Sequence, residues 1–176
     1  MENCLVVIDY QKDFVDGSLG TNEAQQIDSA VAREIAKCRD EGWDVVFTMD
    51  THGEDYLETS EGKHLPVVHC VRGTDGHALA EAAHRGRIEK DRVIEKPTFG
   101  SQELYELLKR EQPGRIELIG LVTDICVLTN AVLAKTACPE AEVLVDASCC
   151  AGTTPEMHDA ALRVLESLQV EVVNAD

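Results

Sequence analysis

Residues 116–129 read Ile116-Glu-Leu-Ile-Gly120-Leu-Val-Thr-Asp-Ile-Cys126-Val-Leu-Thr129. The apolar first half of this stretch is typical of a buried strand, and the residues from Val127 to Ala137 predict a helix packed on the same core. Cys126 therefore lies at a strand-to-helix junction, where backbone N–H groups and the helix dipole favour a thiolate. The alternative is that Cys126 is a small buried hydrophobic side chain, as most free cysteines are.

Five other short segments have the same apolar, β-branched composition, which is typical of strands covered on both faces of a parallel sheet. They are Cys4–Asp9, Trp43–Met49, Arg92–Glu95, Glu142–Asp146 and Val170–Val173. Amphipathic segments between them predict helices over residues 22–41, 76–85, 101–110, 127–137 and 155–168. Alternating strands and helices predict an α/β fold with a mostly parallel sheet. Since no repeat or linker divides the chain, we expect a single domain over residues 1–176.

The composition limits the classes of partner. The chain has 176 residues, of which 44% are hydrophobic, and a formal net charge of −17. This charge disfavours a nucleic-acid or anionic-membrane surface, because those partners attract clusters of Lys and Arg. The sequence shows no secretory signal pattern, and no apolar run approaches the roughly 20 residues that span a membrane. Its seven cysteines lack paired C-x-x-C spacing, so we expect a reduced, cytoplasmic protein.

Three predicted strands deliver reactive side chains at their ends: Asp9, Lys96 and Cys126. Open α/β sheets bind ligands at the carboxyl ends of their strands, so these groups converge if the three strands are neighbours. Asp9 can then take the thiol proton as a general base, and the charge of Lys96 favours the carboxylate and the thiolate. A cysteine with an adjacent base is the usual arrangement for covalent acyl transfer. Taken singly, Asp9 is also interpretable as a turn cap and Lys96 as a solvated loop lysine.

A second group of polar residues follows the strand predicted at 43–49. Asp50 and His52 lie two residues apart, and His69 lies downstream of them. The acidic residues and the histidine between them are Glu54, Glu58, Glu61 and His64. Mixed imidazole and carboxylate ligands suit zinc, iron or manganese, with water in the open positions. The alternative is a solvated polar loop. The remaining histidines fall on predicted helices and are interpreted as structural: His77, His84 and His158.

Six short motifs occur in the order and at the spacing of a known family. They are Val7-Ile-Asp-Tyr-Gln-Lys-Asp-Phe14, Asp50-Thr-His52, Leu65-Pro-Val-Val-His-Cys70, Glu95-Lys-Pro97, Gly120-Leu-Val-Thr-Asp-Ile-Cys126 and Asp146-Ala147. On these motifs the chain resembles the isochorismatase-like cysteine hydrolase superfamily, and within it is most similar to the nicotinamidases. The resemblance runs from residue 5 to about residue 165.

The resemblance implies a fold and a catalytic centre. The implied fold has three layers, in which a six-stranded, mostly parallel sheet is flanked by helices on both faces. The implied catalytic residues are Asp9, Lys96 and Cys126. A cis peptide bond is implied between Val122 and Thr123, where it directs backbone N–H groups, including that of Cys126, into an oxyanion hole.

The resemblance also implies a divalent metal that binds the pyridine nitrogen of the substrate. The implied ligands are Asp50, His52, His69 and a further carboxylate, for which Glu61 matches best and Glu58 is the alternative. We expect zinc, with iron and manganese as the other candidates.

The implied substrate pocket departs from the usual nicotinamidase pattern. Phe14 matches an aromatic wall of that pocket. Leu65 or Pro66 stands where a tryptophan often precedes the Pro-x-His segment. After Lys96, Phe99 is the only nearby ring.

The implied reaction is hydrolysis of a small carboxamide through a Cys126 thioester, with nicotinamide giving nicotinate and ammonia as the expected case. Only 4% of the residues are aromatic, so few can stack on a pyridine, and a carbamoyl or ureido amide is the first alternative. Isochorismatase-type hydrolysis and a catalytically silent binding protein on the same fold are the others. The presence of Cys126 favours amide over vinyl-ether hydrolysis, because some isochorismatases lack this cysteine. On the resemblance alone, we expect a homo-oligomer.

Overall fold

The computed structural model describes residues 1–175. Parallel strands form one six-stranded sheet in the order β3-β2-β1-β4-β5-β6. In chain order the strands are β1 (Asn3–Ile8), β2 (Asp44–Asp50), β3 (Arg92–Lys96), β4 (Arg115–Leu121), β5 (Glu142–Ala151) and β6 (Glu171–Val173). The predicted α/β fold is confirmed, and each pair of neighbouring strands is parallel.

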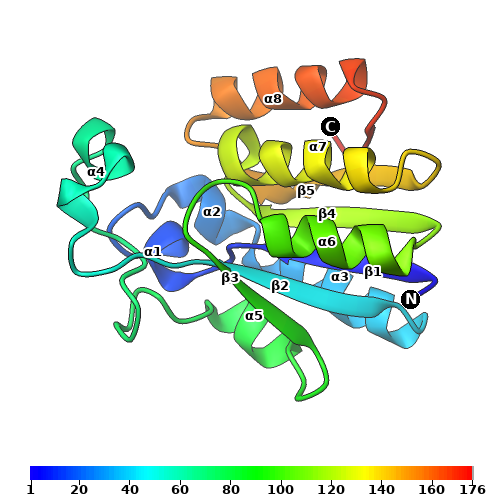
Figure 1. Cartoon of the computed structure of the whole chain (residues 1–176), viewed down its shortest axis with the longest axis horizontal. Helices are drawn as coiled ribbons and strands as arrows, with labels where there is room; N and C mark the ends of the chain where they lie inside the picture. Colours follow the sequence, from blue (N-terminus) through cyan, green and yellow to red (C-terminus); the bar gives the residue numbers. More distant parts are fainter. Residues whose placement is uncertain (176) are drawn as a thin grey trace.

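Helices cover both faces of the sheet (Figure 1). One face carries α6 (Gln102–Glu111), α7 (Leu128–Ala137) and α8 (Pro155–Ser167). The other face carries α3 (Asp28–Asp40) and α5 (Glu81–Gly86), with α1 (Lys12–Val15) and α2 (Asn22–Gln26) nearer the carboxyl ends of the strands. These are the three predicted layers. Within residues 1–175, no helix has the length and apolar character needed to cross a bilayer.

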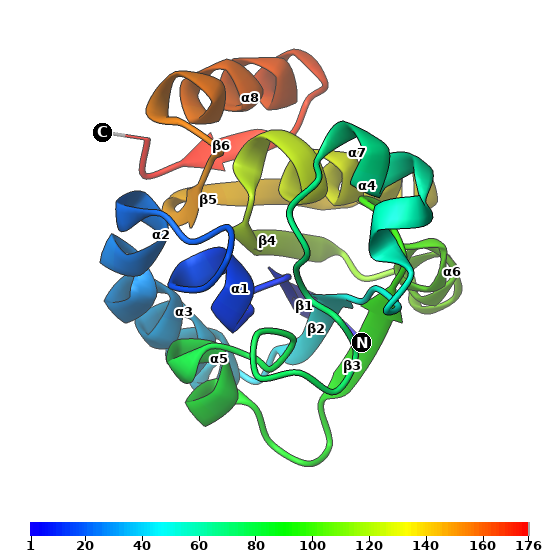
Figure 2. The ribbon, with the colours of Figure 1, turned by 90° about the vertical axis from the view of Figure 1, so that its left-hand side faces the viewer.

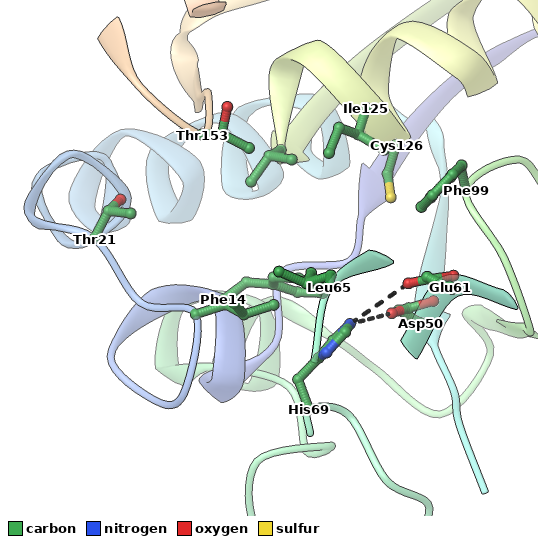
Figure 3. A pocket seen from close by; sticks show the side chains of 12 residues that line it. Phe14, Thr21, Asp50, Glu61, Leu65, His69, Phe99, Ile125, Cys126 and Thr153 are labelled. Carbon is green, nitrogen blue, oxygen red and sulfur yellow. Dashed lines mark ion pairs between the residues drawn. The ribbon is translucent and has the colours of Figure 1, made fainter. Parts of the chain in front are cut away.

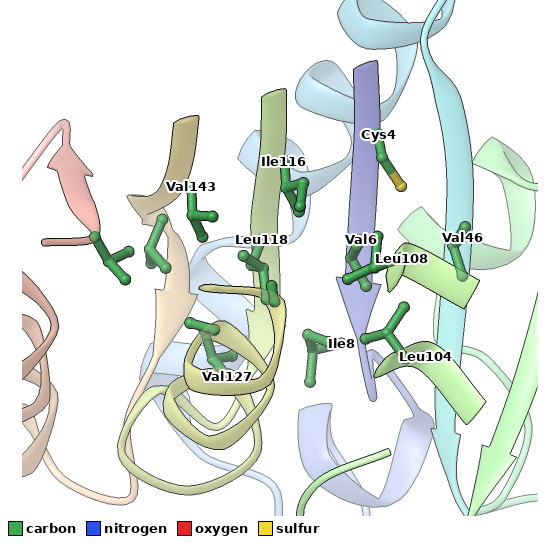
Figure 4. Packing of buried hydrophobic residues seen from close by; sticks show 14 of the residues in the cluster. Cys4, Val6, Ile8, Val46, Leu104, Leu108, Ile116, Leu118, Val127 and Val143 are labelled. Atoms are coloured by element: carbon green, nitrogen blue, oxygen red, sulfur yellow. The ribbon is translucent and has the colours of Figure 1, made fainter. Parts of the chain in front are cut away.

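Successive side chains of β1 point to opposite faces of the sheet, so the hydrophobic core has two parts. Cys4, Val6 and Ile8 pack with α6 and α7 on one face (Figure 4). Leu5 and Val7 pack with α3 and α5 on the other. All five side chains are fully buried, and burying an aliphatic side chain of this size contributes roughly 1.5–3 kcal/mol. The middle of the sheet is therefore a well-packed support for the polar groups at its strand ends.

The helix predicted over residues 22–41 is interrupted at Ile27, which separates α2 from α3. The Tyr10 hydroxyl is hydrogen-bonded to the carbonyl of Ala24 at 3.2 Å and to Asp28 Oδ1 at 3.3 Å. A continuous helix would need the Ala24 carbonyl to accept from the amide four residues later. The prediction of one unbroken helix is therefore wrong, because a buried tyrosine from β1's end takes that acceptor.

Residues 76–80, predicted as the start of a helix, form turns instead, and α5 begins at Glu81. The amides of Lys12 and Asp13 donate to the carbonyls of Ala78 and Gly76, both at 3.0 Å. Carbonyls engaged by α1 in this way are not free to build a helical ladder. His77 consequently lies in a turn and not on a helix.

Strand β5 also differs from prediction, since it continues to Ala151 after a register shift against β4.

The polar loop predicted after residue 50 contains two short helices, η1 (Tyr56–Glu58) and α4 (Ser60–His64). The Thr59 hydroxyl caps α4 by accepting from the amide of Gly62 at 3.0 Å. Figure 2, which looks onto the carboxyl ends of the strands, shows α4 and its flanking loop in front of the sheet. This segment brings Glu61 close to the end of β2.

Two acidic side chains face each other beneath α3. Glu117 of β4 and Glu34 of α3 are both buried. Burial, followed by repulsion from Glu34, raises the pKa of Glu117 from an ordinary 4.5 to about 8. Between these values the folded chain keeps a proton that the unfolded chain has released. The free energy of unfolding must therefore fall as the pH rises through this interval.

Replacing Glu117 by glutamine should remove this pH dependence, because a neutral amide of similar size has no charge to desolvate. Relative to the wild type, we expect Glu117→Gln to gain roughly 1–3 kcal/mol of stability between about pH 5 and about pH 8. Urea unfolding of both proteins across that range measures the difference. Parallel stability curves for the two proteins would contradict the assignment of a raised pKa to Glu117.

Candidate active site

The carboxyl ends of β1, β3 and β4, on one edge of the sheet, bring together the first predicted group. Asp9 directly follows β1, which lies between β2 and β4. Lys96 is the last residue of β3, and its backbone pairs with Asp50 of β2. Cys126 lies in a π-helical turn, η2 (Thr123–Val127), directly after β4. The expected convergence of Asp9, Lys96 and Cys126 is what the structure shows.

Lys96 contacts both other members of this group. Its Nζ atom lies 2.6 Å from Asp9 Oδ2 and 3.5 Å from Cys126 Sγ, and it donates to the carbonyl of Thr98 at 2.9 Å. The side chain is 1% exposed, so the alternative of a solvated loop lysine is wrong. Burial opposes its charge, but the surrounding carboxylates, Asp9 first, outweigh burial and raise the pKa of Lys96. Lys96 is thus a permanently charged, buried cation.

Asp9 is completely buried and has a positive φ of 43°. The hydroxyl of Thr48, on the adjacent strand β2, donates to Asp9 Oδ1 at 2.7 Å. Burial raises the pKa of Asp9, and the charge of Lys96 offsets only part of this effect. A carboxyl group that is buried, raised in pKa and held at a strand end is suited to taking and returning a proton.

Cys126 is 5% exposed and borders a pocket. Burial and the neighbouring Asp9 raise the pKa of its thiol well above the ordinary value, although Lys96 acts in the opposite direction. Lys96 favours the thiolate as expected, but desolvation outweighs its effect. A neutral thiol at this position needs a base, and Asp9 lies in the same charged group.

The turn η2 begins after a cis peptide bond between Leu121 and Val122. The predicted position, between Val122 and Thr123, is one bond too late. The carbonyl of Val122 is an acceptor of the turn. It accepts from the amides of Ile125 at 3.2 Å and Val127 at 3.1 Å. Among the described residues, the amide of Cys126 has no acceptor outside η2. An amide in this position is a candidate donor to an oxyanion.

Close packing of β4 against β1 fixes the approach to this turn. Gly120 has a φ of +118°, and a Cβ atom there would lie 2.1 Å from the carbonyl oxygen of Ile8. Only glycine combines that backbone conformation with so close an approach. The strand that carries η2 is therefore pressed against the strand that carries Asp9.

Four side chains form the second predicted group, and Figure 3 shows three of them, Asp50, Glu61 and His69, across the pocket from Cys126. Asp50, His52, Glu61 and His69 each place one ligand atom within 4.8 Å of the others. The predicted alternative, Glu58, lies exposed in η1 and is not a member. Glu61 is therefore the carboxylate that completes the group.

The donor set fits a divalent metal ion. His69 Nδ1 is hydrogen-bonded to the carbonyl of Val67 at 2.7 Å, which leaves Nε2 to face the group. Asp50 Oδ2 lies 2.8 Å from His52 Nε2 and 3.4 Å from His69 Nε2. Burial tends to raise the pKa of Asp50, but the two histidines and Lys96 outweigh it and lower the pKa. Because Asp50 and both histidines are buried, the alternative of a solvated polar loop is wrong.

A cavity of about 200 Å³ lies between the two groups. Its lining contains the three predicted pocket residues, Phe14, Leu65 and Phe99. The others are Leu19, Thr21, Asp50, Glu61, His69, Val122, Ile125, Cys126 and Thr153. Figure 3 shows the sulfur of Cys126 on one side of this space and the carboxylates of Asp50 and Glu61 on the other, with the apolar side chains of Leu65 and Phe99 at its sides. Within the described part of the chain, no lysine or arginine lines this cavity, and its size suits a ligand of about one ring.

Comparison with known proteins agrees with this geometry. The family model described as the isochorismatase domain matches residues 3–176. The chain belongs to the isochorismatase family. This confirms the resemblance that the sequence motifs indicate.

Named relatives of this isochorismatase-family chain cleave amides, as their names state. A nicotinamidase of Acinetobacter baylyi is 27% identical in an alignment that covers 82% of this chain and 80% of that protein. The pyrazinamidase of Pyrococcus horikoshii, solved in complex with zinc, has a TM-score of 0.85 and 26% identity, covering 98% of this chain and 99% of that one. N-carbamoylsarcosine amidase of Thermoplasma acidophilum has a TM-score of 0.79 and 26% identity, with coverage of 98% and 95%.

Sequence reasoning missed one buried polar side chain of this isochorismatase-family site. Gln11 donates from Nε2 to the carbonyls of Asp50 and His77, both at 2.9 Å, and accepts from the amide of Asp50 at 2.7 Å. It is fully buried and holds the backbone of Asp50 from two sides. A glutamine two residues after a strand-end aspartate was the only signal for it. His77, beside it, is hydrogen-bonded to the Thr51 hydroxyl at 2.8 Å.

Replacing Gln11 by leucine should weaken metal binding without removing a ligand. Losing the bonds that fix the Asp50 backbone is expected to raise the dissociation constant for zinc by about 10–100-fold. Isothermal titration of metal-free protein with zinc measures this change. Gln26→Leu, an exposed position at the end of α2, is the matched control. Equal zinc affinity in the two variants would show that Gln11 does not position the site.

Proposed function

We propose that this isochorismatase-family hydrolase is a cysteine amidase that converts a small neutral carboxamide, nicotinamide first among them, to a carboxylate and ammonia. The observation that carries the proposal is the contact of Asp9, Lys96 and Cys126 at one wall of a one-ring pocket. A histidine and carboxylate group suited to a metal forms the opposite wall. The sulfur and the metal group can therefore engage two ends of one small molecule.

The mechanism starts with the neutral thiol. Asp9 takes the proton of Cys126 as the sulfur attacks the amide carbonyl carbon, forming the C–S bond and a tetrahedral oxyanion. The amide of Cys126, which has no acceptor outside η2 among the described residues, is the proposed donor for that oxyanion. Protonated Asp9 then gives its proton to the leaving nitrogen, and ammonia departs from the thioester. Water, deprotonated by the same carboxylate, attacks the thioester carbonyl carbon; the C–S bond then breaks, the acid is released, and Asp9 returns the proton to the sulfur.

Lys96 supports both halves of this cycle. Its charge, 2.6 Å from Asp9 and 3.5 Å from the sulfur, stabilises whichever of the two groups is negative. A divalent metal, for which we propose zinc, would be held by Asp50, His52, Glu61 and His69, and would supply a Lewis acid for a ring nitrogen of the substrate.

The lining of the pocket favours a neutral substrate. Among the described residues no lysine or arginine lines the cavity, so a substrate carboxylate would find a cation only at the metal group, where it would compete with the ring nitrogen that we propose binds there. N-carbamoylsarcosine carries such a carboxylate, so this alternative is disfavoured despite the similar fold. Phe14, Leu65 and Phe99 instead offer apolar contact to a flat ring.

A panel of compounds tests the proposal by ammonia release from the zinc-loaded protein. We expect turnover of nicotinamide and pyrazinamide, weaker turnover of benzamide, which lacks a ring nitrogen, and none of N-carbamoylsarcosine. Turnover of N-carbamoylsarcosine alone would support the carbamoyl alternative instead. Conversion of isochorismate alone would support the vinyl-ether alternative, and no turnover of any compound would support a silent binding protein. The homo-oligomer, the cytoplasmic location and the single domain over residues 1–176 stay predictions.

A further inference from the structure

A partly buried hydrogen bond joins α8 to the turn that carries the nucleophile. Thr123 Oγ1 lies 2.7 Å from His158 Nδ1. Thr123 is fully buried and is the first residue of η2. Burial lowers the pKa of His158, although Asp159 and Asp124 oppose this effect. The ring is therefore neutral near neutral pH and pairs with the hydroxyl as an uncharged partner.

The next residue of the turn, Asp124, is held by a second set of hydrogen bonds. The carboxylate of Asp124 accepts from the amide and from the hydroxyl of Thr153, both at 2.7 Å. Thr153 lies beyond the end of β5 and lines the substrate pocket. A Cβ atom at Gly152 would lie 2.7 Å from the amide nitrogen of His158 and 2.9 Å from Asp124 Oδ1. The end of β5, the start of α8 and η2 thus meet with no space for a side chain.

Two consecutive residues of η2 are consequently held from outside, just upstream of Cys126. A π-helical turn is uncommon and poorly stabilised by its own hydrogen bonds, so its shape depends on such neighbours. The orientation of the Cys126 amide follows from the orientation of this turn.

We propose that His158 is a positioning residue for the amidase, acting through Thr123 to hold the η2 amides toward the oxyanion; this inference rests on the proposed function. His158 does not line the pocket and is not a member of the metal group. It therefore has no direct contact with substrate, and its effect passes through one hydrogen bond. The sequence predicts a structural role for His158, and the proposal specifies that role as support of the η2 turn.

Removing this bond should slow the chemical step more than it weakens binding. In His158→Leu we expect kcat to fall about tenfold while KM changes less than about twofold, because oxyanion donors act on the transition state and not on the bound amide. His158→Asn keeps a polar atom near the position of Nδ1 and should recover most of kcat. Arg163→Leu, an exposed position on the same helix, is the control for adding a leucine to α8.

Hydrogen exchange gives a readout that needs no substrate. In His158→Leu we expect the amides of residues 123–127 to exchange about tenfold faster than in the wild type, with His158→Asn close to the wild type. Exchange in α6 and β1 should be unchanged. Unchanged exchange in the turn, an equal acceleration throughout the chain, or no recovery by asparagine would overturn the positioning role. If no amide is turned over, the exchange result still decides this inference, and only the proposed function fails.

Discussion

Replacing Cys126 by alanine is expected to abolish amide hydrolysis, with kcat reduced by about 10⁴-fold or more. The sulfur lies at the pocket wall beside a base and a cation, and loss of a covalent nucleophile typically has an effect of this size. Ammonia release from nicotinamide by wild type and variant measures it. Cys4→Ala is the matched control and should retain full activity. Cys4 is a fully buried cysteine near the start of β1, at the end of the strand remote from Asp9. Hydrolysis by Cys126→Ala at the wild-type rate would rule out the covalent mechanism.

Replacing Lys96 by methionine is expected to damage stability and activity together. Methionine keeps much of the side-chain volume but leaves the buried carboxylates of Asp9 and Asp50 without their cation. Breaking a buried pair in this way costs roughly 3–5 kcal/mol. Urea unfolding measures the loss of stability, and ammonia release measures the loss of activity.

A double variant separates the two effects of Lys96. Adding Asp9→Asn to Lys96→Met removes the charge that methionine leaves unpaired, so we expect much of the lost stability to return. Activity should stay at least about 10²-fold below wild type, because the general base is also absent. Recovery of activity in the double variant would show that the pair is needed for folding and not for chemistry.

The sequence predicted which residues meet at the site because parallel strands end at one edge of a sheet. Asp9, Lys96 and Cys126 each follow a recognisable apolar strand, so placing the strands side by side placed the side chains. His52 and His69 are brought together by the backbone bond from the amide of His52 to the carbonyl of Cys70, at 3.0 Å. That contact spans two segments without periodic patterning, so residue types suggested the group but left a solvated loop as the alternative, and the family's motifs favoured the metal site.

Features that depend on competition in three dimensions could not be predicted in the same way. The break between α2 and α3 arises because the Tyr10 hydroxyl reaches Ala24 from another part of the chain. The choice of Glu61 over Glu58 depends on α4, a short helix inside a polar loop. The neutral state of Cys126 depends on desolvation outweighing a nearby Lys96. A local pattern of residues shows none of these three outcomes, because each depends on contacts between distant parts of the chain.

The central claim is that Cys126 forms an acyl intermediate from a small aromatic amide, and hydroxylamine partitioning tests it most directly. Hydroxylamine competes with water for a thioester, so an intermediate shared by two substrates gives one ratio of hydroxamate to acid. We predict the same ratio from nicotinamide and from methyl nicotinate with wild-type protein, and no hydroxamate with Cys126→Ala. A ratio that changes with the leaving group, or hydroxamate formed by Cys126→Ala, would contradict a thioester on Cys126.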